Sequence, residues 1–306
     1  MASGCPVSMV NPNETESNLP NVLLISTHDT GRHLGCYGHA TVDTPNIDRL
    51  AAGGCRMANC FSVSPICSPS RASMMTSHYP QRHGVTTIVN RERGIDLREG
   101  EVHLARRFSD AGYATALIGV QHESADRSID GFDHVGEGRP MRSAPEFARE
   151  AAAYIEQAEA PFYLQIGFFE THTDYAFGGA EPDSEKGVAI PPYVRDTPEA
   201  REWMAAFQGS VKQADRGVGI LIEALERAGK LDDTLVIFTS DHGIELPRAK
   251  WFLYDPSTGV PMISRWRALI PIHNFGTLSP VAFASLACLR SKLRKLWQPR
   301  EMAMAT

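Results

Sequence analysis

The sequence predicts an α/β fold with a mostly parallel central sheet flanked by helices. Two observations predict it: short apolar runs recur between helical patterns along residues 21–266, and the apolar residues of these runs are consecutive instead of alternating with polar residues. Runs of this kind are typical of strands that are covered on both faces, as in parallel sheets. The chain has 306 residues, of which 42% are hydrophobic, enough for one large domain or two small ones with a sizeable core.

Four strands are predicted, and each ends just before polar, potentially reactive residues. The apolar runs are residues 21–27, 114–120, 162–169 and 234–240. The helical patterns between them cover residues 44–52, 99–111, 144–158 and 198–228, with Pro45 suited to a first turn and Gly229 to a helix end. Open sheets of parallel strands bind ligands beyond the carboxyl ends of their strands, so a functional site is predicted there.

Composition argues against several classes of protein. The formal net charge of -6 argues against a general binder of nucleic acids. No apolar run reaches the length of a membrane span, and residues 1–20 lack the basic start and apolar stretch of a secretory signal, so we expect a cytoplasmic protein without a membrane partner. The six cysteines form no CxxC pair and are expected to be free thiols.

The densest chemical signal lies in residues 64–84, which read SPICSPSRASMMTSHYPQRHG. Cys67 opens a CxPSR motif in what is predicted as a loop leading into a helix that begins near Pro69. The amino terminus of a helix attracts anions. On chemistry alone, Cys67 is either a nucleophile with a lowered pKa or a buried thiol.

This motif, followed by AS, an apolar pair and TxxYPxxHG, resembles the sulfatase signature. In that family the cysteine is oxidised to formylglycine (3-oxoalanine) by a formylglycine-generating enzyme. Further segments resemble successive parts of the family in the family's order: NVLLISTHDTGRHLGCYG, TPNIDRLAAGG, GFDHV, FFETHTDY and FTSDHGIELPRAKWFLYDPSTGVPMI. The resemblance covers residues 21–266, and sulfamidase-like members look nearest. It implies an alkaline-phosphatase-like α/β domain with a divalent metal, usually calcium, with magnesium or another divalent ion as alternatives.

The resemblance also implies roles for individual side chains. The sulfur of a sulfate ester is surrounded by negative oxygens, so the site must neutralise charge and supply a nucleophile that can later be expelled. By position after the strands and by resemblance, His122 holds the hydrated aldehyde or acts as a base, and His172 contacts the sulfate or the leaving oxygen. Arg71 is expected to fix the hydrate with its donor fork, and Lys250 occupies the place of the family's sulfate-binding base.

Asp29 and Asp241 are the predicted metal ligands, joined by His242, His28 and an oxygen of the modified Cys67. Carboxylates from two strand ends suit a hard cation such as calcium or magnesium. Members of the family commonly carry paired acids after the first strand. The histidine at position 28 removes one charge and shifts the expected preference toward ions that tolerate imidazole.

The chain departs from the family at other places. Val120 replaces a lysine that many members carry, and Ser77 stands where a smaller residue is usual. The family's C-terminal subdomain has no recognisable counterpart after Trp266, and residues 256–306 contain seven basic residues but only one acid, Glu301. We therefore expect a polar N-terminal tail (residues 1–20), a catalytic domain (residues 21–266) and an aberrant basic tail (residues 267–306). A shifted reading frame in a gene for a longer protein would produce such a tail.

The predicted function is hydrolysis of a sulfate ester or sulfamate, on a small molecule or a saccharide. One alternative is a phosphodiesterase or phosphonate monoester hydrolase of the same superfamily, because these enzymes resemble sulfatases in nucleophile and metal site. The other alternative is an inactive, truncated fragment, because the C-terminal region and the family lysine are missing.

Overall fold

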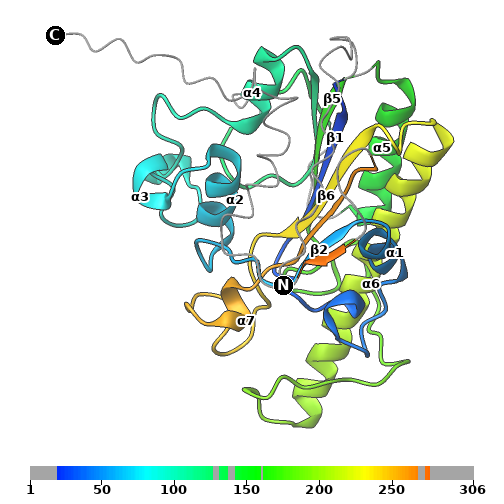
Figure 1. Cartoon of the computed structure of the whole chain (residues 1–306). Coiled ribbons are helices and arrows are strands. Elements are labelled where there is room, and N and C mark those ends of the chain that lie inside the picture. Colours follow the sequence, from blue (N-terminus) through cyan, green and yellow to red (C-terminus); the bar gives the residue numbers. More distant parts are fainter. Residues whose placement is uncertain (1–18, 127–130, 137–141, 160, 268–272, 276–306) are drawn as a thin grey trace, which may run out of the picture.

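The structure, a computed structural model, describes residues 19–126, 131–136, 142–159, 161–267 and 273–275. These residues form a mixed sheet in the strand order β4-β3-β5-β1-β6-β7-β2-β8 (Figure 1). The strands from β4 to β6 in this order are parallel neighbours, and β7 runs antiparallel to both β6 and β2. The strand bounds are β1 Asn21–Thr27, β2 Cys55–Met57, β3 Ala114–Gly119, β4 His134–Val135, β5 Phe162–Phe168, β6 Thr234–Ser240, β7 Met262–Arg265 and β8 His273–Phe275.

Helices cover both faces of the sheet (Figure 1). Helices α1, α5 and α6 lie on one face, and α2 and α4 lie on the other. Besides three short 3-10 turns, the helices among the described residues are α1 Pro45–Ala52, α2 Cys67–Thr76, α3 Pro80–His83, α4 Leu104–Asp110, α5 Ala144–Gln157, α6 Pro198–Arg227 and α7 Asp255–Thr258. None of these helices combines the length and the apolar character that a membrane span requires.

Strand β1 shows why the predicted runs contain consecutive apolar residues. Leu23 and Ile25 belong to the core under α1, α5 and α6, whereas Val22 and Leu24 belong to the core under α2 and α4. Successive side chains of a strand point to opposite faces, so a strand covered on both sides needs apolar residues at every position. The predicted fold class, an α/β domain with a mostly parallel sheet flanked by helices, is confirmed.

Most predicted elements are present, with some differences in their bounds. Strands β1 and β6 have the predicted bounds. The helix predicted for residues 99–111 begins only at Leu104, because the side chain of His103 caps it by accepting a hydrogen bond from the backbone of Ala105. Helix α2 begins at Cys67 and not near Pro69. Most of the predicted tails, residues 1–18 and much of 267–306, lies outside the described residues, although β8 falls within the latter range.

Helix α1 is held at its first turn by a carboxylate from α6. Asp215 accepts hydrogen bonds from the backbone of Ile47 (2.8 Å) and from both the backbone and the side chain of Asn46 (3.3 and 2.8 Å). The substitution Asp215→Ala is expected to lower the free energy of unfolding by about 1–2 kcal/mol, because it leaves these donors without an acceptor. Urea titration would measure the change. Glu226→Ala on the exposed side of the same helix is the control, and equal losses for the two variants would contradict the role of Asp215.

Glu170, just after β5, makes stability depend on pH. Its carboxylate is buried and accepts hydrogen bonds from the backbone of Ala144 and of Phe169. Burial raises the pKa of Glu170 to about 7 from the usual 4.5, so the folded state binds its proton more tightly. The free energy of unfolding should therefore fall by up to about 3 kcal/mol between pH 4.5 and pH 7 on account of this group. Urea titrations across this range should show that Glu170→Gln removes this part of the pH dependence. A wild-type slope kept by the variant would contradict it.

Candidate active site

Polar side chains gather at the edge of the sheet where the central parallel strands end. Strands β1 and β6 pair in parallel up to their last residues, so the segments that follow them, residues 28–29 and 241–242, begin side by side. Strands β3 and β5 end at the same edge and are followed by His122 and His172. The residues that follow these four strands thus lie at one edge of the sheet, as the sequence predicted.

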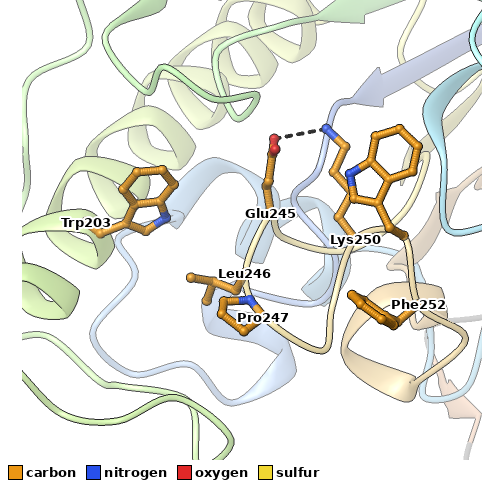
Figure 2. Close-up of a pocket in the computed structure, with 7 residues that line it drawn as sticks. Trp203, Glu245, Leu246, Pro247, Lys250 and Phe252 are labelled. Carbon is orange, nitrogen blue, oxygen red and sulfur yellow. Dashed lines mark hydrogen bonds and ion pairs between the residues drawn. The ribbon is translucent and has the colours of Figure 1, made fainter.

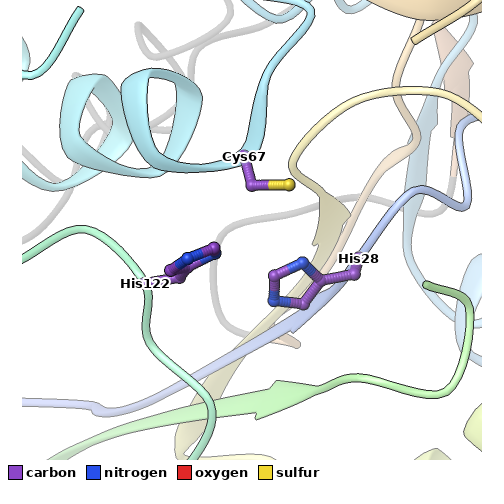
Figure 3. Close-up of side chains that lie close together, drawn as sticks. All are labelled: His28, Cys67 and His122. Atoms are coloured by element: carbon purple, nitrogen blue, oxygen red, sulfur yellow. The ribbon is translucent and has the colours of Figure 1, made fainter. Parts of the chain in front are cut away.

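Cys67 is the first residue of helix α2 and is buried at this edge. Its sulfur lies 3.2 Å from Nε2 of His242 and 3.8 Å from Oδ1 of Asp29. Figure 3 shows its thiol close to the imidazole rings of His28 and His122, which come from two other segments. The residue at position 67 therefore contacts groups that follow both β1 and β6.

The environment of Cys67 disfavours a thiolate. Burial raises the pKa of the thiol well above its usual value, and the carboxylates of Asp241 and Asp29 raise it further. A thiol that is protonated at neutral pH is a poor nucleophile. The alternative of an unmodified cysteine with a lowered pKa is therefore not supported by the structure.

Asp29 and Asp241 form a buried pair of carboxylates. Oδ1 of Asp241 accepts hydrogen bonds from the backbone N–H groups of Asp29 (2.9 Å) and His242 (2.8 Å). Asp29 adopts a left-handed backbone conformation with φ of 47°, which is uncommon outside glycine, although aspartate is among the residues that tolerate it. The two hydrogen bonds fix one carboxylate against the turn that carries the other.

Arg71 lies beneath this pair and is almost fully buried. Its Nε donates to Oδ2 of Asp241 at 3.0 Å. The remaining donors reach Oγ of Ser26 and the backbone carbonyls of Thr27 and Gln121, at 2.9–3.3 Å. The guanidinium thus connects the ends of β1, β3 and β6. Burial alone would raise the pKa of Asp241, but the charges of His242 and Arg71 outweigh burial and hold this pKa below its usual range.

The imidazole of His28 is fully buried, and neither ring nitrogen has a hydrogen-bond partner among the described residues. Nδ1 lies 3.2 Å from Oδ2 of Asp241, but the angles are not those of a hydrogen bond. Burial, with a further effect of Arg71, lowers the pKa of His28 well below its usual value. A neutral, buried imidazole without a partner has a lone pair available for a metal ion.

The predicted ligands fit a divalent cation. His28, Asp29, Cys67 and Asp241 each offer a ligand atom, and these atoms lie within 4.8 Å of one another. Carboxylates suit calcium and magnesium, whereas imidazole suits first-row transition ions and zinc. Four of the five residues predicted as ligands therefore come together, and the fifth, His242, contacts Asp29, Cys67 and Asp241.

Lys250 brings a positive charge to the other side of Asp29. Its Nζ donates to Oδ2 of Asp29 at 2.7 Å and to Oε2 of Glu245 at 3.1 Å, and it lies 3.4 Å from Nε2 of His172. Burial opposes the charge, but Asp29 and its other negative neighbours outweigh this effect and raise the pKa of Lys250 above its usual value. A fixed ammonium beside the carboxylate pair is suited to bind an anion.

His122 and His172 both lie near the ring of His28, with ring centroids 5.8 and 5.9 Å from it. Burial, with a further effect of Arg71, lowers the pKa of His122 to about 4, and its Nδ1 has no partner among the described residues. His172 stacks on Phe169, and its Nδ1 donates to the carbonyl of Thr173 at 2.5 Å, so Nε2 is the ring nitrogen that can face a ligand. The neutral imidazole of His122 thus keeps an unprotonated nitrogen for proton transfer.

The sequence analysis did not single out Glu245, which contacts both Lys250 and the hydroxyl of Thr173. The only signal was its position five residues before Lys250 in the stretch after β6. It also did not identify the acceptors of Arg71, since backbone carbonyls and a serine hydroxyl carry no distinctive pattern. Both omissions concern groups that act on a predicted residue but have no distinctive sequence pattern of their own.

Comparisons with known proteins show which family this chain resembles. The profile of the Sulfatase family matches residues 20–284. N-sulphoglucosamine sulphohydrolase from Homo sapiens is 30% identical over 276 residues, which cover 79% of this chain and 54% of the human protein. This chain therefore spans about half the length of that relative.

Two solved structures share the fold. BT4656 in complex with its substrate D-glucosamine-2-N,6-O-disulfate gives a TM-score of 0.70 at 18% identity, covering 90% of this chain and 76% of that one. The phosphonate monoester hydrolase of Agrobacterium radiobacter gives a TM-score of 0.64 at 22% identity, covering 82% and 68%. These likenesses confirm the predicted fold. Because the family profile matches most of the sequence, including the CxPSR motif and the segments after all four strands, this chain belongs to the sulfatase family.

Proposed function

We propose that the chain hydrolyses a sulfate ester or sulfamate, on a small molecule or a saccharide, through a formylglycine made from Cys67 by a formylglycine-generating enzyme. The observation that carries the proposal is the position of Cys67. Its sulfur lies 3.8 Å from Oδ1 of Asp29 in a buried cluster with the imidazole of His28, whose ring nitrogens have no hydrogen-bond partner among the described residues. A nucleophilic oxygen at this place would lie beside both a metal site and a fixed ammonium.

A divalent cation, either calcium or an ion that better tolerates imidazole, would draw charge from the sulfate oxygens. The residues that would hold it are those of the buried cluster together with its neighbour, namely His28, Asp29, Asp241, His242 and an oxygen at position 67. The hydrated aldehyde would supply one hydroxyl to attack sulfur and a second whose deprotonation releases sulfate and restores the aldehyde.

The chain's own residues would bind the sulfate and move the protons. Lys250 places its ammonium 2.7 Å from Asp29, where it would neutralise a sulfate oxygen. His172 would give a proton to the leaving oxygen or nitrogen as its bond to sulfur breaks. His122 would hold the hydrate or accept the proton of its second hydroxyl. Arg71 would position Asp241 and the strand ends, because its resolved hydrogen bonds already go to them.

The test is expression together with a formylglycine-generating enzyme, followed by mass spectrometry of the peptide that contains position 67. The modified protein is then assayed with p-nitrophenyl sulfate and N-sulfoglucosamine, with calcium, magnesium, manganese or EDTA present. We expect turnover that needs both the modification and a divalent ion. A folded and modified protein that hydrolyses neither substrate with any of these ions would contradict the proposal, and would favour an inactive fragment of a longer enzyme.

The likeness in fold to the phosphonate monoester hydrolase keeps a second activity under consideration. The same assay with p-nitrophenyl phosphate and a phenyl ester of phenylphosphonic acid separates the two. A higher kcat/KM for the sulfates supports the sulfatase, whereas a higher value for the phosphonate ester identifies the alternative.

A further inference from the structure

His28, Cys67 and His122 bring two imidazoles and a thiol together at the carboxyl edge of the sheet (Figure 3). Each of them offers one ligand atom, and the three atoms lie within 4.8 Å of one another. The residues come from three segments, since His28 follows β1, Cys67 begins helix α2 and His122 follows β3. This group, called the thiol cluster below, has two nitrogens and one sulfur as donors. It therefore differs from the set of carboxylates and an oxygen at position 67 that would hold the cation of the proposed function.

The two imidazoles of the thiol cluster are available to bind a metal ion. His28 is fully buried, and neither of its ring nitrogens has a hydrogen-bond partner among the described residues. Nδ1 of His122 is also buried without a partner there. Burial lowers the pKa of both rings, so each is neutral at pH 7 and has a lone pair for a cation. A buried polar atom without a partner is costly, and a bound ion is one way to satisfy it.

The backbone holds His122 in place. Its φ is 77°, in the left-handed region, which histidine adopts more often than most residues do. The side chain of Gln121 closes this turn, because its Oε1 accepts hydrogen bonds from the N–H groups of Glu123 (2.6 Å) and Ser124 (3.0 Å). The carbonyl of Gln121 accepts a further hydrogen bond from Arg71 at 3.3 Å. The turn that carries the ring is therefore anchored, which reduces the ordering that metal binding requires.

The charges around the thiol cluster favour a cation. The carboxylates of Asp29 and Asp241 lie beside it, and Oδ1 of Asp29 is 3.8 Å from the sulfur. The neighbouring cationic groups are already paired: Arg71 with Asp241 at 3.0 Å, and Lys250 with Asp29 at 2.7 Å and Glu245 at 3.1 Å. Figure 2 shows the ammonium of Lys250 directed at Glu245. Three carboxylates thus face two cationic side chains, and a thiolate would add a further negative charge.

We propose that the chain, while Cys67 is unmodified, binds a zinc ion through the sulfur of Cys67 and one ring nitrogen each of His28 and His122. Thiolate and imidazole are ligands that zinc prefers, and three protein ligands leave a fourth position for water. As the bond between sulfur and zinc forms, the thiol gives its proton to solvent, whereas the neutral imidazoles release none. Calcium takes oxygen ligands and would bind these donors poorly. The inference does not depend on the proposed function, because it concerns the unmodified chain.

Cobalt(II), a coloured substitute for zinc, provides the first test. The protein is expressed without a formylglycine-generating enzyme, mass spectrometry verifies the thiol at position 67, and Co²⁺ is titrated without oxygen. We expect a sulfur-to-cobalt charge-transfer absorption that Zn²⁺ abolishes and that calcium in about 100-fold excess leaves intact. Cys67→Ser, which has a similar volume, should lack this absorption, whereas Cys60→Ala, a free cysteine outside the cluster, should keep it. Cobalt bound without the absorption, an absorption that survives in Cys67→Ser, or displacement by calcium would overturn the proposal.

Calorimetry provides a second test through affinity and proton release. Titration with Zn²⁺ at pH 7, in buffers with different ionisation enthalpies, should show release of about one proton per ion. His28→Ala and His122→Ala should each weaken zinc binding by about tenfold or more, whereas His134→Ala, an exposed histidine outside the cluster, should leave it unchanged. Urea titrations show whether each variant is folded. Wild-type zinc affinity in both folded cluster variants would contradict the proposal. Since no turnover is measured, failure to hydrolyse sulfates would count against the proposed function alone.

Discussion

Replacing Cys67 by alanine is expected to lower kcat for p-nitrophenyl sulfate by at least about 10⁴-fold, to the background rate. The substitution removes the side chain from which the proposed nucleophile is made. It should cost little stability, because one buried sulfur is lost from a side chain whose hydrogen-bonding contacts are with His242 and Asp29. The measurement is steady-state hydrolysis by the protein expressed with the modifying enzyme, together with a urea titration to show that the variant is folded.

Two further variants test whether the residue at position 67 is the nucleophile. Cys60→Ala removes another free cysteine, which lies outside the cluster, and should keep wild-type turnover. An unmodified Cys67→Ser carries a single hydroxyl that can attack sulfur but has no second hydroxyl to expel the sulfate. It should therefore release at most one equivalent of nitrophenol and then stop. Sustained turnover by Cys67→Ala would show that another group is the nucleophile.

The second large effect is on stability, for the substitution Arg71→Met. Arg71 is buried and supplies the donors that join Asp241 to the ends of β1 and β3. Methionine has a similar volume but no charge, so the carboxylate of Asp241 loses its guanidinium partner in a buried position. Breaking a buried ion pair in this way typically costs 3–5 kcal/mol, and we expect the free energy of unfolding in urea to fall by about that amount.

The control for this prediction is Arg91→Met, because Arg91 has a side chain that is 77% exposed and its ion pair with Asp126 is long, at 3.8 Å. Its effect should stay within about 0.5 kcal/mol. Equal losses for the two variants would show that the hydrogen bonds of Arg71 contribute nothing to the folded state. A cooperative transition with an unchanged slope would be needed to interpret either value.

The sequence predicted the central part of the fold well, because those strands are buried on both faces. Strands β1 and β6 each have four consecutive apolar residues at their centre, and the polar residues that follow mark where they end. The four strands that were not predicted contain two to four residues each and include exposed or charged positions such as Arg56 in β2 and Arg265 in β7. Such strands depend on pairing with distant segments, which no local pattern reveals.

In the candidate site, too, some residues could be predicted from the sequence and others could not. The residues that follow strand ends could be predicted, because parallel strands bring their carboxyl ends to one edge whatever their order in the sheet. The contact between Glu245 and Lys250 could not be predicted, because it depends on the path of the loop that follows β6. The exposure of Trp203, Trp251 and Phe252 could not be predicted either, since tryptophan and phenylalanine in a sequence normally indicate buried positions.

The burial of Cys67 also bears on when the thiol becomes covered during synthesis of the chain. Its neighbour His242 is 175 positions later in the chain, so at a synthesis rate of roughly 5–20 residues per second the ribosome makes it about ten to thirty-five seconds after Cys67. Until β6 and the residues after it exist, nothing from that strand can cover the thiol. An enzyme that modifies Cys67, as proposed above, would therefore find the thiol uncovered by these residues during synthesis.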